Sequence, residues 1–107
     1  MATFDDREKG FESKFALDQE QEFRATARRN KLLGLWAAEK MELSPEGADD
    51  YAKAVVRADF EQPGDEDVFR KVAGDLKGAG ISASDSEIRS KMDELYSIAR
   101  DQIRAGE

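Results

Sequence analysis

The sequence predicts an all-α protein, a four-helix bundle preceded by a flexible N-terminal segment. An uncharged run, Leu32–Ala38, lies in a stretch rich in Ala, Leu, Arg, Lys and Glu, a composition that favours helix over strand. Further stretches repeat apolar residues at intervals of three and four, as amphipathic helices do. Ser-Pro, Pro-Gly and Gly-Ala-Gly separate these stretches and are typical of helix ends and turns.

The stretch Phe23–Met41 is predicted to form the central helix. Its seven uncharged residues point to every side of a helix, and a helix that is apolar all round needs neighbours all round. The run includes the single tryptophan, Trp36. A buried strand is the alternative, but Thr26 is the only β-branched residue of the stretch.

A second helix is predicted over residues 45–59. Ser44 is a favourable N-cap, and Pro45 suits the first helical position because its missing N–H is not needed there. Phe60 is expected to fold back on the core. The apolar face recurs at helical spacing and consists of Ala48, Tyr51, Ala52, Val55 and Val56.

Two more helices complete the predicted bundle. Acids at residues 65–67 open the third helix, where the helix dipole favours them, and Gly78-Ala79-Gly80 ends it with a left-handed cap, beside which Ile81 is expected to seal the core. Ser84 and Glu87 form a capping box for the last helix, which runs to about Arg104. The expected buried faces are Val68, Phe69, Val72, Ala73 and Leu76 in the third helix, and Ile88, Met92, Leu95, Ala99 and Ile103 in the last.

Residues 1–19 are assigned to a separate, flexible amphipathic segment, and residues 20–107 to the bundle. Phe4, Phe11 and Phe15 are spaced by seven and four, so a helix would carry them on one stripe. Gly10 weakens such a helix. Two interpretations remain open: the segment folds in a groove of a partner, or it extends the central helix and packs its rings on the bundle.

Composition narrows the possible functions. The chain has 107 residues, a net charge of −7, and neither cysteine nor histidine, which excludes disulfide, thiolate and histidine-ligated metal chemistry. We expect no enzyme, no metal site and no nucleic-acid binding, because phosphate contacts need positive surface. No apolar run approaches a membrane span, and the charged N-terminus is unlike a signal peptide. A cytoplasmic or organellar-matrix location is expected.

The charges are unevenly placed. Arg24, Arg28, Arg29 and Lys31 form a basic patch, whereas residues 42–67 carry nine acids and two bases. Arg24 and Arg28 lie one helical turn apart, so their guanidinium groups could share one anion, such as a nucleotide phosphate. The alternative is that the patch pairs internally with acidic side chains. Residues 42–67 could also make the chain an acidic adaptor for a basic partner.

The sequence resembles the zeta subunit, the small inhibitory subunit of the F-type ATP synthase of alphaproteobacteria. The resemblance spans nearly the whole chain in collinear order. The strings that carry it are TFDDREKGFESKFA at 3–16, FRATARRNKLLGLWAAEKM at 23–41, YAKAVVRADFE at 51–61, GDEDVFRKV at 64–72 and IRSKMDEL at 88–95.

The resemblance implies a four-helix bundle that inhibits ATP hydrolysis. In this family the N-terminal segment, here about residues 2–19, inserts as a helix at a catalytic interface between alpha and beta subunits, near the gamma stalk. We also expect the free protein to be a monomer that requires no cofactor, and to be held at the inner membrane through the ATP synthase. The spacing of the phenylalanines suggests them as the contacts. The expected partner-binding residues are Thr3, Phe4, Asp5, Asp6, Arg7, Glu8, Lys9, Phe11, Lys14 and Phe15.

Overall fold

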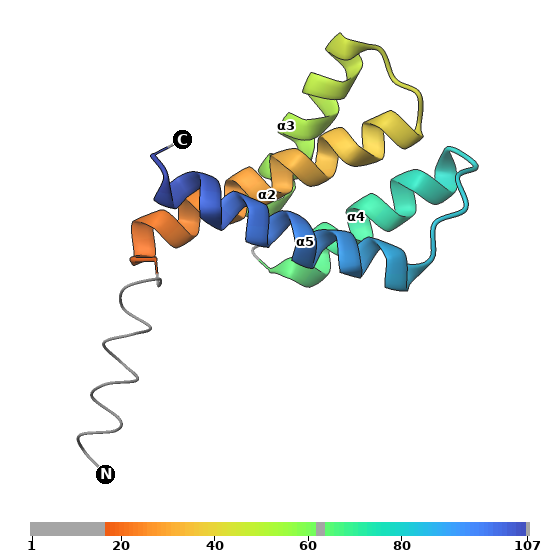
Figure 1. The fold of residues 1–107 in the computed structure, drawn as a ribbon. Coiled ribbons are helices and arrows are strands. Elements are labelled where there is room, and N and C mark those ends of the chain that lie inside the picture. The colour runs from red at the N-terminus through yellow and green to blue at the C-terminus, as the bar shows by residue number, and fades with distance from the viewer. Residues whose placement is uncertain (1–16, 62–63, 107) are drawn as a thin grey trace, which may run out of the picture.

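The computed structural model describes residues 17–61 and 64–106. These residues form four helices and confirm the all-α fold class (Figure 1). The helices are α2 (Gln19–Lys40), α3 (Pro45–Glu61), α4 (Asp65–Gly78) and α5 (Asp85–Arg104).

Helix α2 begins at a reciprocal cap. The Asp18 carboxylate accepts a hydrogen bond from the Gln21 backbone N–H at 2.7 Å, and the Asp18 N–H donates to the Gln21 side chain at 3.2 Å. This capping box satisfies two N–H groups that the first helical turn leaves unpaired. The helix therefore starts one turn before Phe23, and Leu17 just ahead of it is already buried.

The other predicted boundaries are confirmed. Ser44 accepts a hydrogen bond from the Gly47 N–H at 3.1 Å at the start of α3, and Ser84 accepts one from the Glu87 N–H at 3.0 Å at the start of α5. Gly80, at φ 77°, takes the left-handed conformation that ends α4, which glycine adopts without steric cost.

The core lies among all four helices. Trp36 lies at the edge of this core, half-buried, with the ammonium groups of Lys40 and Lys91 at 5.2 and 5.9 Å from its ring centre. The tryptophan therefore covers the core rather than filling it. The buried cluster comprises Leu33, Ala37, Val55, Val68, Phe69, Val72, Leu76, Ile88 and Met92.

Helix α2 packs against α3, α4 and α5 (Figure 1). Among the described residues, α3 and α5 make no contact with each other. They lie on either side of α2, and α4 packs with all three. One side of α2 therefore remains open between α3 and α5.

The crossing of α2 and α3 is unusually close at Gly34. A Cβ at this position would stand 2.6 Å from the Cα of Ala52 and 3.3 Å from a methyl of Val55. Only glycine lets the two backbones approach this far. The glycine in the middle of the apolar run thus has a packing reason that compensates its poor helix propensity.

An ion pair joins α4 to α5 near the start of α4. The Arg89 guanidinium donates to the Glu66 carboxylate at 2.7 Å and stacks on the Phe69 ring, 3.9 Å from its centre. The hydrogen bond from Arg89 lowers the pKa of Glu66 below its ordinary 4.5, and the positive charges of Arg89 and Arg70 act in the same direction.

We expect Gly34→Ala to destabilise the protein. The added methyl would meet backbone, and overpacking of this kind costs about 1–3 kcal/mol, which exceeds the ~1 kcal/mol that alanine gains as a helix former. Urea unfolding followed by circular dichroism measures the change in free energy.

Gly74→Ala is the matched control, because a Cβ there has nothing within 4 Å. This variant should gain about 0.5–1 kcal/mol from helix propensity. Equal effects of the two substitutions would contradict the close crossing.

Arg89→Gln should raise the pKa of Glu66 toward its ordinary value, which a carbon-detected NMR titration measures. Because the folded pKa is lowered, the stabilisation by this charge pair is present at neutral pH and is lost as the pH falls through the folded pKa. The destabilisation by Arg89→Gln should therefore shrink in acid. A pKa of Glu66 that is unaffected by Arg89→Gln would show that another group sets it.

Candidate functional site

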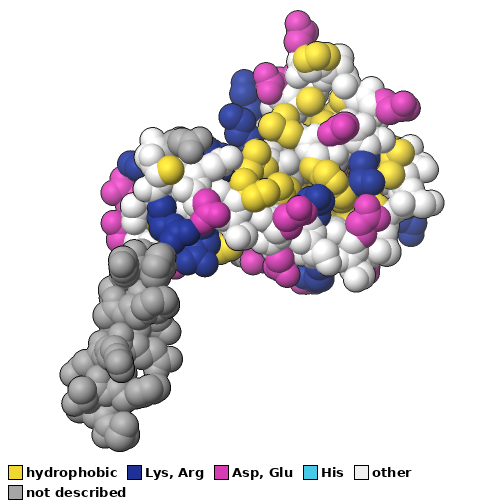
Figure 2. All heavy atoms as spheres, in the orientation of Figure 1, with side chains coloured by type: hydrophobic (Ala, Val, Ile, Leu, Met, Phe, Trp, Pro, Cys, Tyr) yellow, Lys and Arg dark blue, Asp and Glu magenta, His cyan; other side chains and the backbone are white. Residues whose placement is uncertain are grey.

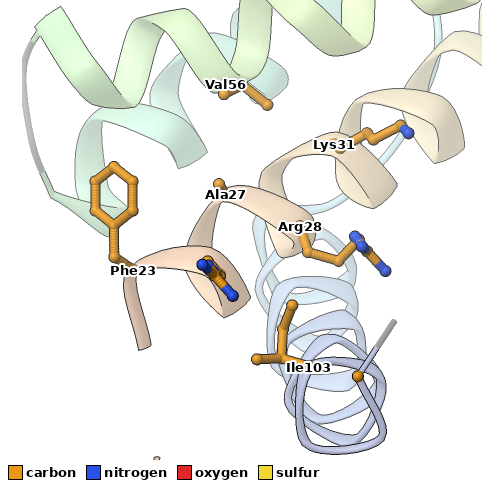
Figure 3. Close-up of a pocket in the computed structure, with 8 residues that line it drawn as sticks. Phe23, Ala27, Arg28, Lys31, Val56 and Ile103 are labelled. Carbon is orange, nitrogen blue, oxygen red and sulfur yellow. The ribbon is translucent and has the colours of Figure 1, made fainter. Parts of the chain in front are cut away.

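The open side of α2 forms a groove, which we call the outer groove. It encloses about 450 Å³ and receives side chains from α2, α3 and α5 (Figure 3). The eight residues that line it are Phe23, Arg24, Ala27, Arg28, Lys31, Val56, Ile103 and Gly106.

The outer groove and the core lie on nearly opposite sides of α2. At 100° per residue, Ala27 projects about 160° away from Arg29, and Lys31 about 160° away from Leu33; Arg29 and Leu33 are buried. The groove exists because α3 and α5 do not meet over this side of the helix. Val56 was predicted for the buried face of α3, but it is only half-buried because it lines the groove.

An aromatic pair lies at one end of the outer groove. The rings of Phe23 and Phe60 are 5.3 Å apart between centres, yet the two residues are 57% and 55% exposed. The prediction that Phe60 folds back on the core is therefore wrong. The end of α3 lies over the start of α2, so Phe60 contacts Phe23 on the outside of the molecule.

The predicted anion-binding pair, Arg24 and Arg28, lines the outer groove together with Lys31. Arg24 forms an ion pair with Glu20 at 2.7 Å, and Arg28 donates to the side-chain oxygen of Gln102 at 2.7 Å. In the view of Figure 2, Lys and Arg side chains gather where α2 begins and α5 ends. That the two guanidinium groups share one nucleotide phosphate stays a prediction.

Arg29 plays a different part from its neighbours. Its side chain is only 4% exposed, donates to Asp65 at 2.9 Å and donates to the Asn30 side chain at 2.8 Å. The expectation that the basic patch pairs with the acidic stretch 42–67 is thus confirmed for Arg29. A buried guanidinium needs such partners, because removing it from water unpaired is costly.

Asn30 extends this polar network to α3. It is fully buried, and its amide donates to the Asp59 carboxylate at 2.9 Å, whose other oxygen accepts from the Gly64 N–H at 3.1 Å. Gly64 precedes Asp65, so the network closes on itself and fixes the start of α4 against α2. We call Arg29, Asn30, Asp59 and Asp65 the polar ring.

The polar ring was not predicted from the sequence. A signal was present, because Asn30 has apolar or small residues three and four positions away on both sides, at Thr26, Ala27, Leu33 and Gly34. A polar residue in that setting on a central helix is a candidate for a buried hydrogen bond.

Several acids of the stretch 42–67 are used within the fold. Asp59 and Asp65 belong to the polar ring, and Glu66 and Asp67 pair with arginines, Asp67 with Arg70 at 3.7 Å. Less charge is therefore left for a basic partner than the sequence suggested. The acidic-adaptor hypothesis stays a prediction.

The titratable groups with shifted pKa values have structural partners. Burial raises the pKa of the Tyr51 hydroxyl, and its 2.7 Å hydrogen bond to the Asp75 carboxylate raises it further. Tyr51 therefore stays protonated and ties α3 to α4. Within residues 17–61 and 64–106, no three acidic side chains are grouped to hold a metal ion.

None of the described helices is both long and apolar enough to span a bilayer. The expected partner-binding residues Thr3, Phe4, Asp5, Asp6, Arg7, Glu8, Lys9, Phe11, Lys14 and Phe15 all lie outside the described part of the chain. Of the segment assigned to residues 1–19, the structure describes Leu17, Asp18 and Gln19, which already belong to the body or its first helix.

The described residues form a four-helix body with an open groove on one side of α2. The family model of the ATPase inhibitor subunit zeta matches residues 1–102. The chain belongs to this family, which implies a regulatory role on the ATP synthase and confirms the resemblance seen in the sequence.

A solved relative agrees with the fold. A protein solved by solution NMR is 46% identical, with a TM-score of 0.69, over 80% of this chain and 98% of that chain. A search of curated proteins found no match.

We expect Asn30→Ala to destabilise the fold by about 1–3 kcal/mol, because it removes a hydrogen-bond partner from the buried Arg29 and from the half-buried Asp59. Thermal and urea unfolding measure the loss. Arg24→Ala is the control: its ion pair with Glu20 is exposed, and such pairs contribute about 0–1 kcal/mol. A loss no larger than that of the control would mean that the polar ring contributes little.

Proposed function

We propose that this chain inhibits ATP hydrolysis by the F-type ATP synthase through its N-terminal segment. Residues 2–19 insert at a catalytic interface between an alpha and a beta subunit, near the gamma stalk, and block rotation. The helical body stays outside and holds the segment in place. The protein then acts at the inner membrane as a peripheral subunit.

The observation that carries this proposal is the extent of the family match. It begins at residue 1 and includes the segment that precedes the body. The body supplies a firm starting point for that segment, because the buried Leu17 and the capping box of Asp18 fix the chain where α2 begins.

The proposed contacts are energetically adequate. Three aromatic side chains on one stripe can bury several hundred Å² in a groove, worth a few kcal/mol at about 25 cal/mol per Å². The cost of ordering the segment offsets part of this gain. The resulting net binding free energy is modest, which suits an inhibitor that can be released.

Deleting residues 2–14 should abolish inhibition while the body stays folded, since the described contacts begin at Leu17. The measurement is ATP hydrolysis by the matching catalytic sector with the full chain or the shortened one. Circular dichroism of the shortened chain checks the fold. Full inhibition without residues 2–14 would refute the proposal.

Single substitutions separate the aromatic contacts from charge. Phe11→Ala and Phe15→Ala should each raise the concentration needed for half inhibition, whereas Lys9→Ala serves as the control outside the stripe and should raise it less. Equal effects of all three would argue against an aromatic stripe as the contact.

A further inference from the structure

The outer groove is an unfilled position in the helix packing. Its floor is apolar, formed by Ala27, Val56 and Ile103, and its α2 side carries Arg24, Arg28 and Lys31. Two adjoining hollows share Val56 and continue the groove along α3. A helix with an aromatic stripe and an acidic edge would match both its floor and its charges.

The chain contains such a segment immediately before the body. On a helix Phe4 and Phe11 share a side, and Asp5, Glu8 and Glu12 form an adjoining stripe. Leu17, the last residue before the cap of α2, lies six residues from Phe23, or about 9 Å along the helix. The segment is therefore tethered at the aromatic end of the outer groove.

The charges also match in spacing. From Asp5 to Glu12 the acids are separated by three and then four residues, and from Lys31 back to Arg24 the cations are separated by three and then four. Two antiparallel helices rise equally per residue. Each of the three acids can therefore face one of the three cations at the same time. Residues 13–17 remain for the reversal, a usual length for a loop between antiparallel helices.

We propose that residues 3–12 fold back as a helix antiparallel to α2 and occupy the outer groove of their own body. Phe15, in the reversal, then lies near the exposed pair Phe23 and Phe60. The facing charges in this register are Glu12 with Arg24, Glu8 with Arg28 and Asp5 with Lys31.

The tether makes even weak docking effective. A short linker holds a segment near its site at about millimolar effective concentration. Docking itself does not depend on the proposed function. The consequence of docking does rest on the proposed function. The residues that occupy the outer groove are those proposed to insert in the ATP synthase, so docking on the body and insertion in the ATP synthase compete. Docking is then a resting state of the inhibitor.

A nitroxide at position 2 tests the docking in the full chain. The chain has no cysteine, so Ala2→Cys gives one labelled site. Docking places the label beyond the far end of the outer groove, and it should broaden the amide NMR signals around Lys31 and Lys53 more than those around Ile81. Broadening that is no greater around Lys31 than around Ile81 overturns the proposal.

Charge exchange tests the register. Lys31→Glu should remove the selective broadening, and adding Asp5→Lys to that variant should restore it. Lys77→Glu is the matched control, because Lys77 is an exposed lysine near the end of α4, away from the groove, and it should change nothing. Selective broadening that persists in Lys31→Glu overturns the proposed register.

Inhibition of the ATPase distinguishes the occupants of the groove. If the segment docks on its own body, Lys31→Glu should lower the concentration needed for half inhibition by roughly twofold or more, because more chains are free to insert. Weaker inhibition by Lys31→Glu, together with no selective broadening in the unsubstituted chain, would overturn docking and assign the groove to the ATP synthase. Selective broadening in a chain that does not inhibit would support docking and refute the proposed function.

Discussion

The close approach of α2 and α3 at Gly34 and Ala52 is the contact on which the rest of the structure depends. Backbones that pass this closely fix the path of α3 along α2, and thereby place Val56 and Phe60 beside the first turns of α2. The same path keeps α3 away from α5. The core on one side of α2 and the outer groove on the other are both consequences of this crossing.

The arginines at positions 24, 28 and 29 of α2 point to two different sides of the helix. Arg29 points into the fold, where Asp65 and Asn30 satisfy its donors, and breaking such a buried pair is far costlier than breaking an exposed one. Arg24 and Arg28 point outward at the groove. Neighbouring arginines thus face the core and the groove separately, so the groove can change without loss of the polar ring.

The sequence predicted the helices well because their signals are local. Caps such as Ser44 and Ser84 act within one turn, and apolar spacing reports one buried face of one helix. The position of Phe60 and the polar ring could not be predicted in the same way, because both depend on which helices meet. Only the path of α3 decides whether Phe60 meets the core or Phe23.

The uneven charge follows from the same division between body and groove. The chain as a whole carries −7, which would repel an acidic segment, yet the outer groove carries Arg24, Arg28 and Lys31 from α2, and three acids of the stretch 42–67 are paired elsewhere in the fold. Asp59 and Asp65 are held by the polar ring, and Glu66 by Arg89. An acidic protein can in this way offer a local site for an acidic helix, since screening limits electrostatic influence at the surface to about 8–10 Å in physiological salt.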